Sequence, residues 1–149
     1  MAEHHVISAR KWIGTPYRHQ SSVKGVGCDC LGLVRGVWRD TVGAEPMVMP
    51  TYTPDWDEYE GLEVLMSGAD QHLIQKPIDV FQPGEILLFR MKRSAVAKHL
   101  GILAPSGSTP RIIHAISGRN VAETSLTPDW QKRIVTQYAF PERSSLWQH

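Results

Sequence analysis

The chain has 149 residues, of which 42% are hydrophobic and 21% are charged, an ordinary globular composition with enough chain for a buried core. The net charge is +1 and the basic residues are scattered, so the sequence gives no electrostatic reason to expect a nucleic-acid partner. No apolar run approaches the length of a bilayer, and we expect no membrane insertion.

The organisation along the chain is simple. No repeat or low-complexity segment interrupts it, and we expect a single domain over residues 1–149. The first ten residues lack the apolar segment of a signal peptide, so we expect synthesis in the cytoplasm without one. Cys28 and Cys30 are the two cysteines, and neighbours this close in sequence would form a strained disulfide, so a disulfide framework is not expected.

The first predicted element is a helix over residues 3–12, with Val6, Ile7 and Ala9 on its apolar side. Residues 14–17, Gly-Thr-Pro-Tyr, end this helix, and a loop continues to Gly27.

A second helix is predicted to begin at Cys30. Asp29 is a good N-cap, and the apolar residues Leu33, Val34, Val37 and Trp38 follow at helical spacing. Gly32 and Gly36 lie on one face of this helix and lower its propensity, which indicates close packing against a neighbouring element.

The second half of the chain changes from helical to strand patterns. Residues 43–54 are predicted to be irregular and residues 56–67 helical. Short apolar segments separated by turn residues then predict strands at residues 86–91, 99–103, 111–115, 121–123 and 134–140. Helices followed by consecutive short strands indicate an α+β fold with an antiparallel sheet.

Cys30 is the first candidate for a catalytic residue, as a nucleophile. A helix N-terminus favours negative charge and is expected to lower the pKa of a thiol placed there. The free N–H groups of the first turn would also suit an oxyanion. The alternative is that Cys30 is a small buried apolar residue, as free cysteines commonly are.

A nucleophilic thiol needs a base and a group that orients the base. His99 and His114 each lie among apolar residues of a predicted strand, and in an antiparallel pair their side chains can lie side by side. Two alternatives stay open: each is a core histidine, or both join Cys28 and Cys30 in a zinc site. The C-x-C spacing is tighter than structural zinc sites usually show.

The ordered motifs of the chain resemble those of the NlpC/P60 peptidases. The matching segments are Gly14–Tyr17, Asp29–Val34, Pro83–Ile86, His99–Ile102 and Ile113–Ala115. This resemblance implies a papain-like α+β fold, with helices packed on an antiparallel sheet and the nucleophile at a helix N-terminus.

The resemblance also implies an activity. The chain would be a cysteine peptidase that hydrolyses peptidoglycan stem peptides, typically at the D-γ-glutamyl–diaminopimelate bond, with no cofactor and no metal. Cys30 would be the nucleophile, His99 the general base and His114 the residue that orients His99. Tyr17 and Asp29 would line the substrate side of the cleft, although a packed aromatic is an equally good reading of Tyr17.

Leu31 departs from most secreted members, which have a small polar residue after the nucleophile. Residues 29–38 and 123–141 look more like the cell-wall peptidases of phage tails and gene transfer agents. That likeness implies delivery to the periplasm or wall of a target cell by a phage-like tail or baseplate, with tail hub, baseplate or tail-fibre proteins as partners. The alternative is a catalytically idle structural component of such a tail. Cys28 would be a spare thiol or a reversible partner of Cys30.

Overall fold

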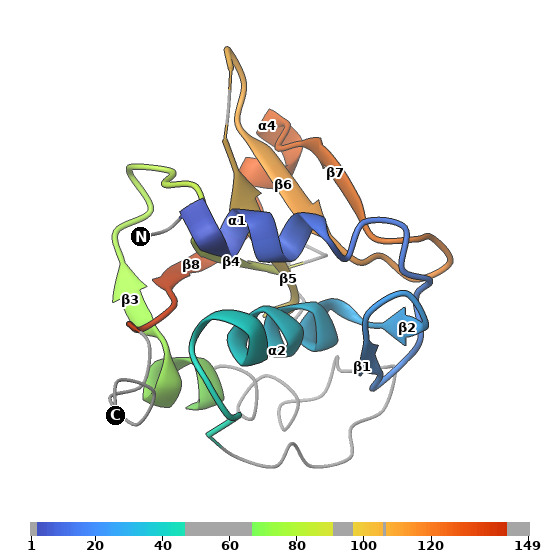
Figure 1. Ribbon diagram of the computed structural model, residues 1–149. Coiled ribbons are helices and arrows are strands. Elements are labelled where there is room, and N and C mark those ends of the chain that lie inside the picture. Colours follow the sequence, from blue (N-terminus) through green and yellow to red (C-terminus); the bar gives the residue numbers. More distant parts are fainter. Residues whose placement is uncertain (1–2, 47–66, 91–96, 106, 143–149) are drawn as a thin grey trace.

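A computed structural model describes residues 3–46, 67–90, 97–105 and 107–142. Two helices, α1 (Glu3–Arg10) and α2 (Cys30–Thr41), lie next to each other against one face of an antiparallel sheet. Figure 1 shows them in front of the sheet, and both contact its strand β5. This is the α+β architecture that the sequence predicted.

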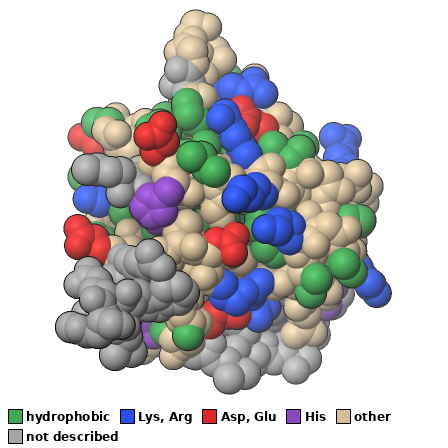
Figure 2. Space-filling view, in the orientation of Figure 1, with side chains coloured by type: hydrophobic (Ala, Val, Ile, Leu, Met, Phe, Trp, Pro, Cys, Tyr) green, Lys and Arg blue, Asp and Glu red, His purple; other side chains and the backbone are tan. Residues whose placement is uncertain are grey.

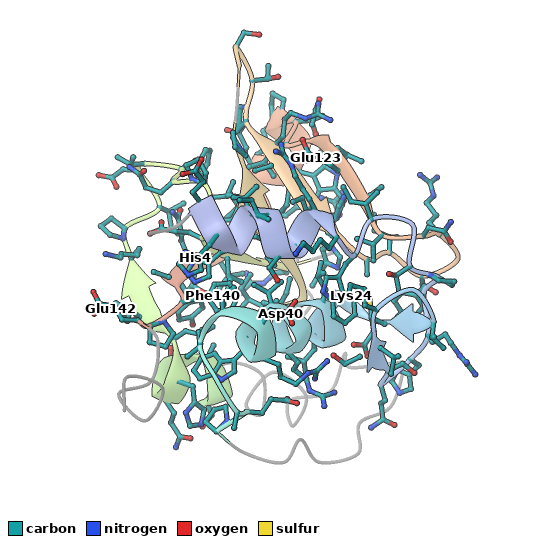
Figure 3. All side chains as sticks on the ribbon, viewed as in Figure 1. His4, Lys24, Asp40, Glu123, Phe140 and Glu142 are labelled. Carbon is teal, nitrogen blue, oxygen red and sulfur yellow. The ribbon has the colours of Figure 1, made fainter. Side chains whose placement is uncertain are left out.

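Helix α1 is confirmed, but its apolar side differs from the prediction. Ile7 is 54% exposed, whereas His5 and Ser8 are buried beside Val6 and Ala9. The Ser8 hydroxyl donates to a carboxylate oxygen of Asp40 at 2.9 Å, which compensates for its burial, and the His5 ring packs on Phe140. Asp40 is labelled on α2 in Figure 3.

The loop between the two helices contains a small hairpin. Strands β1 (Ser22–Val23) and β2 (Gly27–Cys28) pair antiparallel around Gly25, whose φ of 80° suits a residue without a side chain. In Figure 1 the hairpin lies at the end of α2 where the helix begins. It therefore delivers the chain directly into the first turn of α2.

The main sheet has six strands in the order β3-β8-β4-β5-β6-β7, and all adjacent strands are antiparallel. The strands are β3 (Ile74–Lys76), β4 (Ile86–Arg90), β5 (Ala97–Ala104), β6 (Arg111–His114), β7 (Ala122–Ser125) and β8 (Ile134–Ala139).

Both faces of this sheet are covered. Leu33 and Val37 of α2 belong to one buried cluster with Ile102 and Ile113 of the sheet. Alternate residues of the same strands form a second cluster on the opposite face, and the short helix α4 (Pro128–Gln131) contributes Trp130 to it. The members of the second cluster are Leu87, Phe89, Leu103, Ile112 and Leu126, with Phe81, Trp130 and Ile134 packed on them.

The five predicted strands are confirmed to within a few residues, whereas β3 and α4 were not predicted. The predicted helix at residues 56–67 lies outside the described residues except for its last position, and residues 67–72 are helical. Of the predicted irregular segment at 43–54, the described residues 43–46 contain neither helix nor strand.

Among the described residues, no helix is both long and apolar enough to cross a membrane. Figure 2 shows acidic side chains interspersed with Lys and Arg on the face that carries α1 and α2. This matches the near-neutral charge of the sequence.

Candidate active site

The start of α2 fixes the position of Cys30. The Asp29 backbone is extended, and one carboxylate oxygen of Asp29 accepts the N–H of Gly32 at 2.7 Å, as predicted for an N-cap. The other oxygen accepts the N–H of Gln20, also at 2.7 Å. Asp29 thus ties the first turn of the helix to the preceding loop.

Gly32 explains why the loop can lie so close to the helix. A Cβ added at Gly32 would stand 1.9 Å from the carbonyl oxygen of Ser21, a contact that no side chain could make. The Ser22 hydroxyl donates to the Gly32 carbonyl at 2.6 Å on the same side of the helix. The close packing predicted from this glycine is therefore confirmed.

The sulfur of Cys30 lies against β5, where it contacts the backbone N–H of Leu100, the residue that follows His99. Leu103 donates its N–H to Glu85 on the β4 side, so the alternation of an antiparallel strand directs the Leu100 N–H to the opposite side. On that side lies β6, which ends at His114, opposite Gly101. The Leu100 N–H lies just past this last pair, and it hydrogen-bonds the Cys30 sulfur. The nucleophile candidate is thus placed at the peptide that joins His99 to Leu100.

The resting state of the thiol differs from the expectation. Cys30 is partly buried, and burial raises its pKa to about 12, with the neighbouring Asp29 carboxylate as the second cause. The N–H groups of Leu100, Leu31 and Cys30 itself oppose this rise. The prediction that the helix start lowers the pKa of Cys30 is therefore wrong, because desolvation outweighs the N–H groups at this position.

His99 and His114 form a buried hydrogen-bonded pair. The Nε2 atom of His99 lies 3.0 Å from Nδ1 of His114, and the register of β5 and β6 places the two rings on one face of the sheet. The Nε2 atom of His114 lies 2.9 Å from the hydroxyl of Thr124. The side-by-side arrangement predicted from the strand pattern is confirmed, and Thr124 extends it.

Both rings are neutral in the resting protein at neutral pH. Burial lowers the pKa of His99 to about 3, and the proximity of His114 adds to this effect. Burial lowers the pKa of His114 to about 4. A neutral imidazole beside a protonated thiol is an arrangement in which the proton moves only when the sulfur attacks.

Aromatic side chains enclose the histidine pair. The Trp130 ring lies 5.5 Å from the His99 ring and 5.4 Å from the His114 ring, measured between centroids. Phe89 lies 5.8 Å from His99 and packs edge-on against Trp130. This enclosure desolvates the imidazoles and restricts their rotation.

The structure also places Tyr17 near the thiol. Burial raises the pKa of Tyr17 to about 12, and Cys30, Asp29 and Cys28 contribute in that order. Tyr17 is partly buried against the core, so it is both a packed aromatic and a neighbour of the site. Its role toward a substrate, like that of Asp29, stays a prediction.

Cys28 is fully buried and belongs to the core beside α2, and no disulfide joins it to Cys30. Burial raises the pKa of Cys28 to about 12. Cys28 thus has the environment of an apolar core residue. In the part of the chain that the structure describes, no group of three His, Cys, Asp or Glu side chains could hold a metal ion.

Thr124, Trp130 and Phe89 were not identified from the sequence. No local pattern distinguishes Thr124 from any other strand threonine, or Trp130 from any other tryptophan of the sequence. Their proximity to the histidines depends on strand register and on the return of the chain through α4, which motif spacing does not specify.

Comparison with solved structures supports the same fold. The NlpC/p60 domain of the peptidoglycan hydrolase SagA aligns with a TM-score of 0.65 and 19% identity, over 94% of this chain and 99% of that domain. An NlpC/P60 family protein from Bacillus cereus ATCC 10987 aligns with a TM-score of 0.65 and 16% identity, over 94% of this chain. NlpC1 from Trichomonas vaginalis aligns with a TM-score of 0.60 and 21% identity, over 93% of this chain.

The chain spans 40% of the length of the Bacillus cereus protein and 44% of NlpC1. No curated protein sequence matches it. The NlpC/P60 family, however, matches residues 14–139, which include the capped helix start, both histidines and all strands of the sheet. By this match, the chain belongs to the NlpC/P60 family.

Proposed function

We propose that the chain is a cysteine peptidase that hydrolyses peptidoglycan stem peptides, at a bond of the D-γ-glutamyl–diaminopimelate type. The observation that carries the proposal is that the Cys30 sulfur is hydrogen-bonded by the N–H of Leu100, the residue after His99, while Nε2 of His99 is bonded to Nδ1 of His114. Membership of the NlpC/P60 family supports the substrate class, as does the structural likeness to a peptidoglycan hydrolase.

The proposed reaction begins with a thiol and a neutral imidazole. Because Nε2 of His99 bonds to His114, Nδ1 is the nitrogen that receives the Cys30 proton as the sulfur attacks the peptide carbonyl carbon. The first-turn N–H of Cys30 stabilises the oxyanion. His99 then gives the proton to the departing amine as the C–N bond breaks, and water hydrolyses the resulting thioester to regenerate the thiol.

We further propose that the enzyme is made in the cytoplasm and reaches the target cell wall in a phage-like tail or baseplate. The support for this step is the sequence likeness of residues 29–38 and 123–141 to tail-associated peptidases. Tail hub, baseplate or tail-fibre proteins would be its partners.

The alternative is a catalytically idle tail component built on the same scaffold. The raised pKa of Cys30 is the observation that favours it, because a thiol that is protonated at rest is a weaker nucleophile than a thiolate. The two functions differ in one measurable respect, which is peptide release by the free chain.

The test is digestion of purified peptidoglycan, with released muropeptides identified by mass spectrometry. We expect cleavage by the wild type and loss of at least about a thousandfold in rate in Cys30→Ala, since the nucleophile is removed. Cys28→Ala is the matched control: it removes the neighbouring buried thiol and should retain cleavage. Equal release by wild type and Cys30→Ala would eliminate the proposed mechanism, and no release by the wild type would favour the idle component.

A further inference from the structure

The contact between His114 and Thr124 is set by the pairing of β6 with β7. Thr124 is opposite Ile112, and His114 is opposite Ala122. Thr124 and His114 are therefore diagonal neighbours on the same face of the sheet, close enough for the 2.9 Å contact between Nε2 and the hydroxyl oxygen. The three side chains His99, His114 and Thr124 form one continuous row of hydrogen bonds.

The position of Thr124 is well anchored. The adjacent Glu123 points to the opposite face of β7, where its carboxylate accepts from Arg10 of α1 at 2.9 Å and from Arg111 of β6 at 3.0 Å. Figure 3 labels Glu123 on the strand beside the end of α1. These two ion pairs hold β7 to the helix layer and to β6, so the Thr124 hydroxyl stays in register with His114.

The row admits two proton arrangements. In one, Nε2–H of His99 donates to Nδ1 of His114, and Nε2–H of His114 donates to the Thr124 oxygen. In the other, every bond is reversed: the hydroxyl donates to His114, and Nδ1–H of His114 donates to His99. Each neutral ring carries one proton, so the direction of one bond fixes the direction of the next.

Only the first arrangement makes His99 a base. There the proton of His99 is on Nε2, which leaves Nδ1 free to accept the proton of Cys30. In the reversed arrangement Nδ1 already carries the proton and the thiol has no acceptor. The tautomer of His114 therefore decides whether His99 can accept the proton of Cys30.

We propose that Thr124 is a positioning residue of this site: its hydroxyl accepts Nε2–H of His114 and thereby selects the tautomer in which His99 is the general base. The proposal rests on the proposed function for its catalytic consequence. This direction leaves no group without a hydrogen-bond partner: the hydroxyl hydrogen of the exposed Thr124 can reach water, and the Nε2–H of the 2% exposed His114 has the Thr124 oxygen as its acceptor.

The experiment compares Thr124→Val, which keeps the shape and removes the hydroxyl, with Thr124→Ser, which keeps the hydroxyl. In the Val variant a buried N–H at Nε2 of His114 would lack its acceptor, so the proton should move to Nδ1 and reverse the row. We expect kcat/KM on muropeptides to fall about tenfold to a hundredfold in Thr124→Val. Thr124→Ser should stay close to wild type.

Two further measurements separate tautomer selection from a structural role. Nitrogen-15 NMR of histidine-labelled protein without substrate should find the proton of His114 on Nε2 in wild type and Thr124→Ser, and on Nδ1 in Thr124→Val. The pH profile of kcat/KM should shift in Thr124→Val alone. Ser125→Ala, which removes a hydroxyl at the next, exposed position of β7, is the control and should change neither.

The outcomes distinguish this inference from the proposed function. A wild-type spectrum with the His114 proton on Nδ1 overturns the inference directly, even if the Val variant does not fold. Wild-type kcat/KM and tautomers in a folded Thr124→Val also overturn it. If instead the wild type releases no peptide while the tautomers follow the expected pattern, the proposed function fails and the hydrogen-bond assignment stands.

Discussion

Two opposing effects act on the Cys30 thiol. Backbone N–H groups of the first turn of α2 and of β5 stabilise the thiolate, whereas burial and the Asp29 carboxylate destabilise it. Burial is the largest of these contributions, and the pKa rises to about 12. A sequence shows that a cysteine follows an N-cap, but it does not show how much water reaches the sulfur.

Asp29 offers a direct test of this balance. Asp29→Asn removes a negative charge beside the sulfur, so the pKa of Cys30 should fall, as measured by the pH dependence of its alkylation rate. The amide keeps one acceptor for Gly32 but presents a donor to the N–H of Gln20, so the free energy of unfolding should also fall by about 1–2 kcal/mol.

Asp40→Asn is the matched control for Asp29→Asn. Asp40 lies near the other end of α2, where it accepts from Ser8, and its replacement should leave the alkylation profile of Cys30 unchanged. An unchanged profile in Asp29→Asn as well would contradict the assignment of Asp29 as a cause of the raised pKa.

The sequence predicted well those elements whose pattern of apolar residues matches their burial in the folded protein. The apolar segment at β4 is buried on both faces of the sheet, and the alternation around His99 and His114 places their rings on one face. The strand β3 was missed because all three of its residues are exposed at the sheet edge, so no apolar pattern marks it. The helix α4 has only four residues, too few for a helical period.

The packing of α2 against Trp12, in the turn that follows α1, depends on Gly36. A Cβ at Gly36 would stand 2.0 Å from Cζ2 of the buried Trp12 indole. Gly36→Ala should therefore destabilise the protein by about 1–3 kcal/mol, despite the better helix propensity of alanine, because the indole has to shift in a packed core. Denaturant unfolding measures this change.

Gly68→Ala is the comparison for Gly36→Ala. A Cβ at Gly68 meets nothing within 4 Å, and residues 67–72 are helical, so alanine should leave stability unchanged or raise it by up to about 1 kcal/mol. Equal effects of the two substitutions would show that the close contact between Gly36 and Trp12 does not matter for stability.

At the scale of the whole molecule, three of the histidines that the structure describes are buried in their neutral form. His99 and His114 lie in the candidate site, and His5 of α1 packs on Phe140. Burial is the first cause of the lowered pKa in each, to about 3 for His99 and about 4 for His114 and His5. The site and the packing of α1 are therefore sensitive to the same range of pH.

This sensitivity predicts a loss of stability in mild acid. In the unfolded chain these histidines take up protons as the pH falls through about 6.5, whereas in the folded chain they stay neutral until about 4 or 3. The unfolded state thus binds more protons in this interval, so the free energy of unfolding is at its full value above 6.5 and decreases below it. The limiting slope is about 1.4 kcal/mol per pH unit for each histidine.

Denaturant unfolding at a series of pH values between 7 and 4.5 measures the slope, in a window largely above the titration of carboxylates. Of the three histidines, His5 is the one outside the candidate site. His5→Gln removes its contribution, so the slope of the free energy of unfolding against pH should decrease by about one third. A free energy of unfolding that stays constant from pH 6.5 to 4.5 in the wild type would mean that the three rings are not held neutral by the fold. The same result would remove the basis for a neutral His99 beside a protonated Cys30.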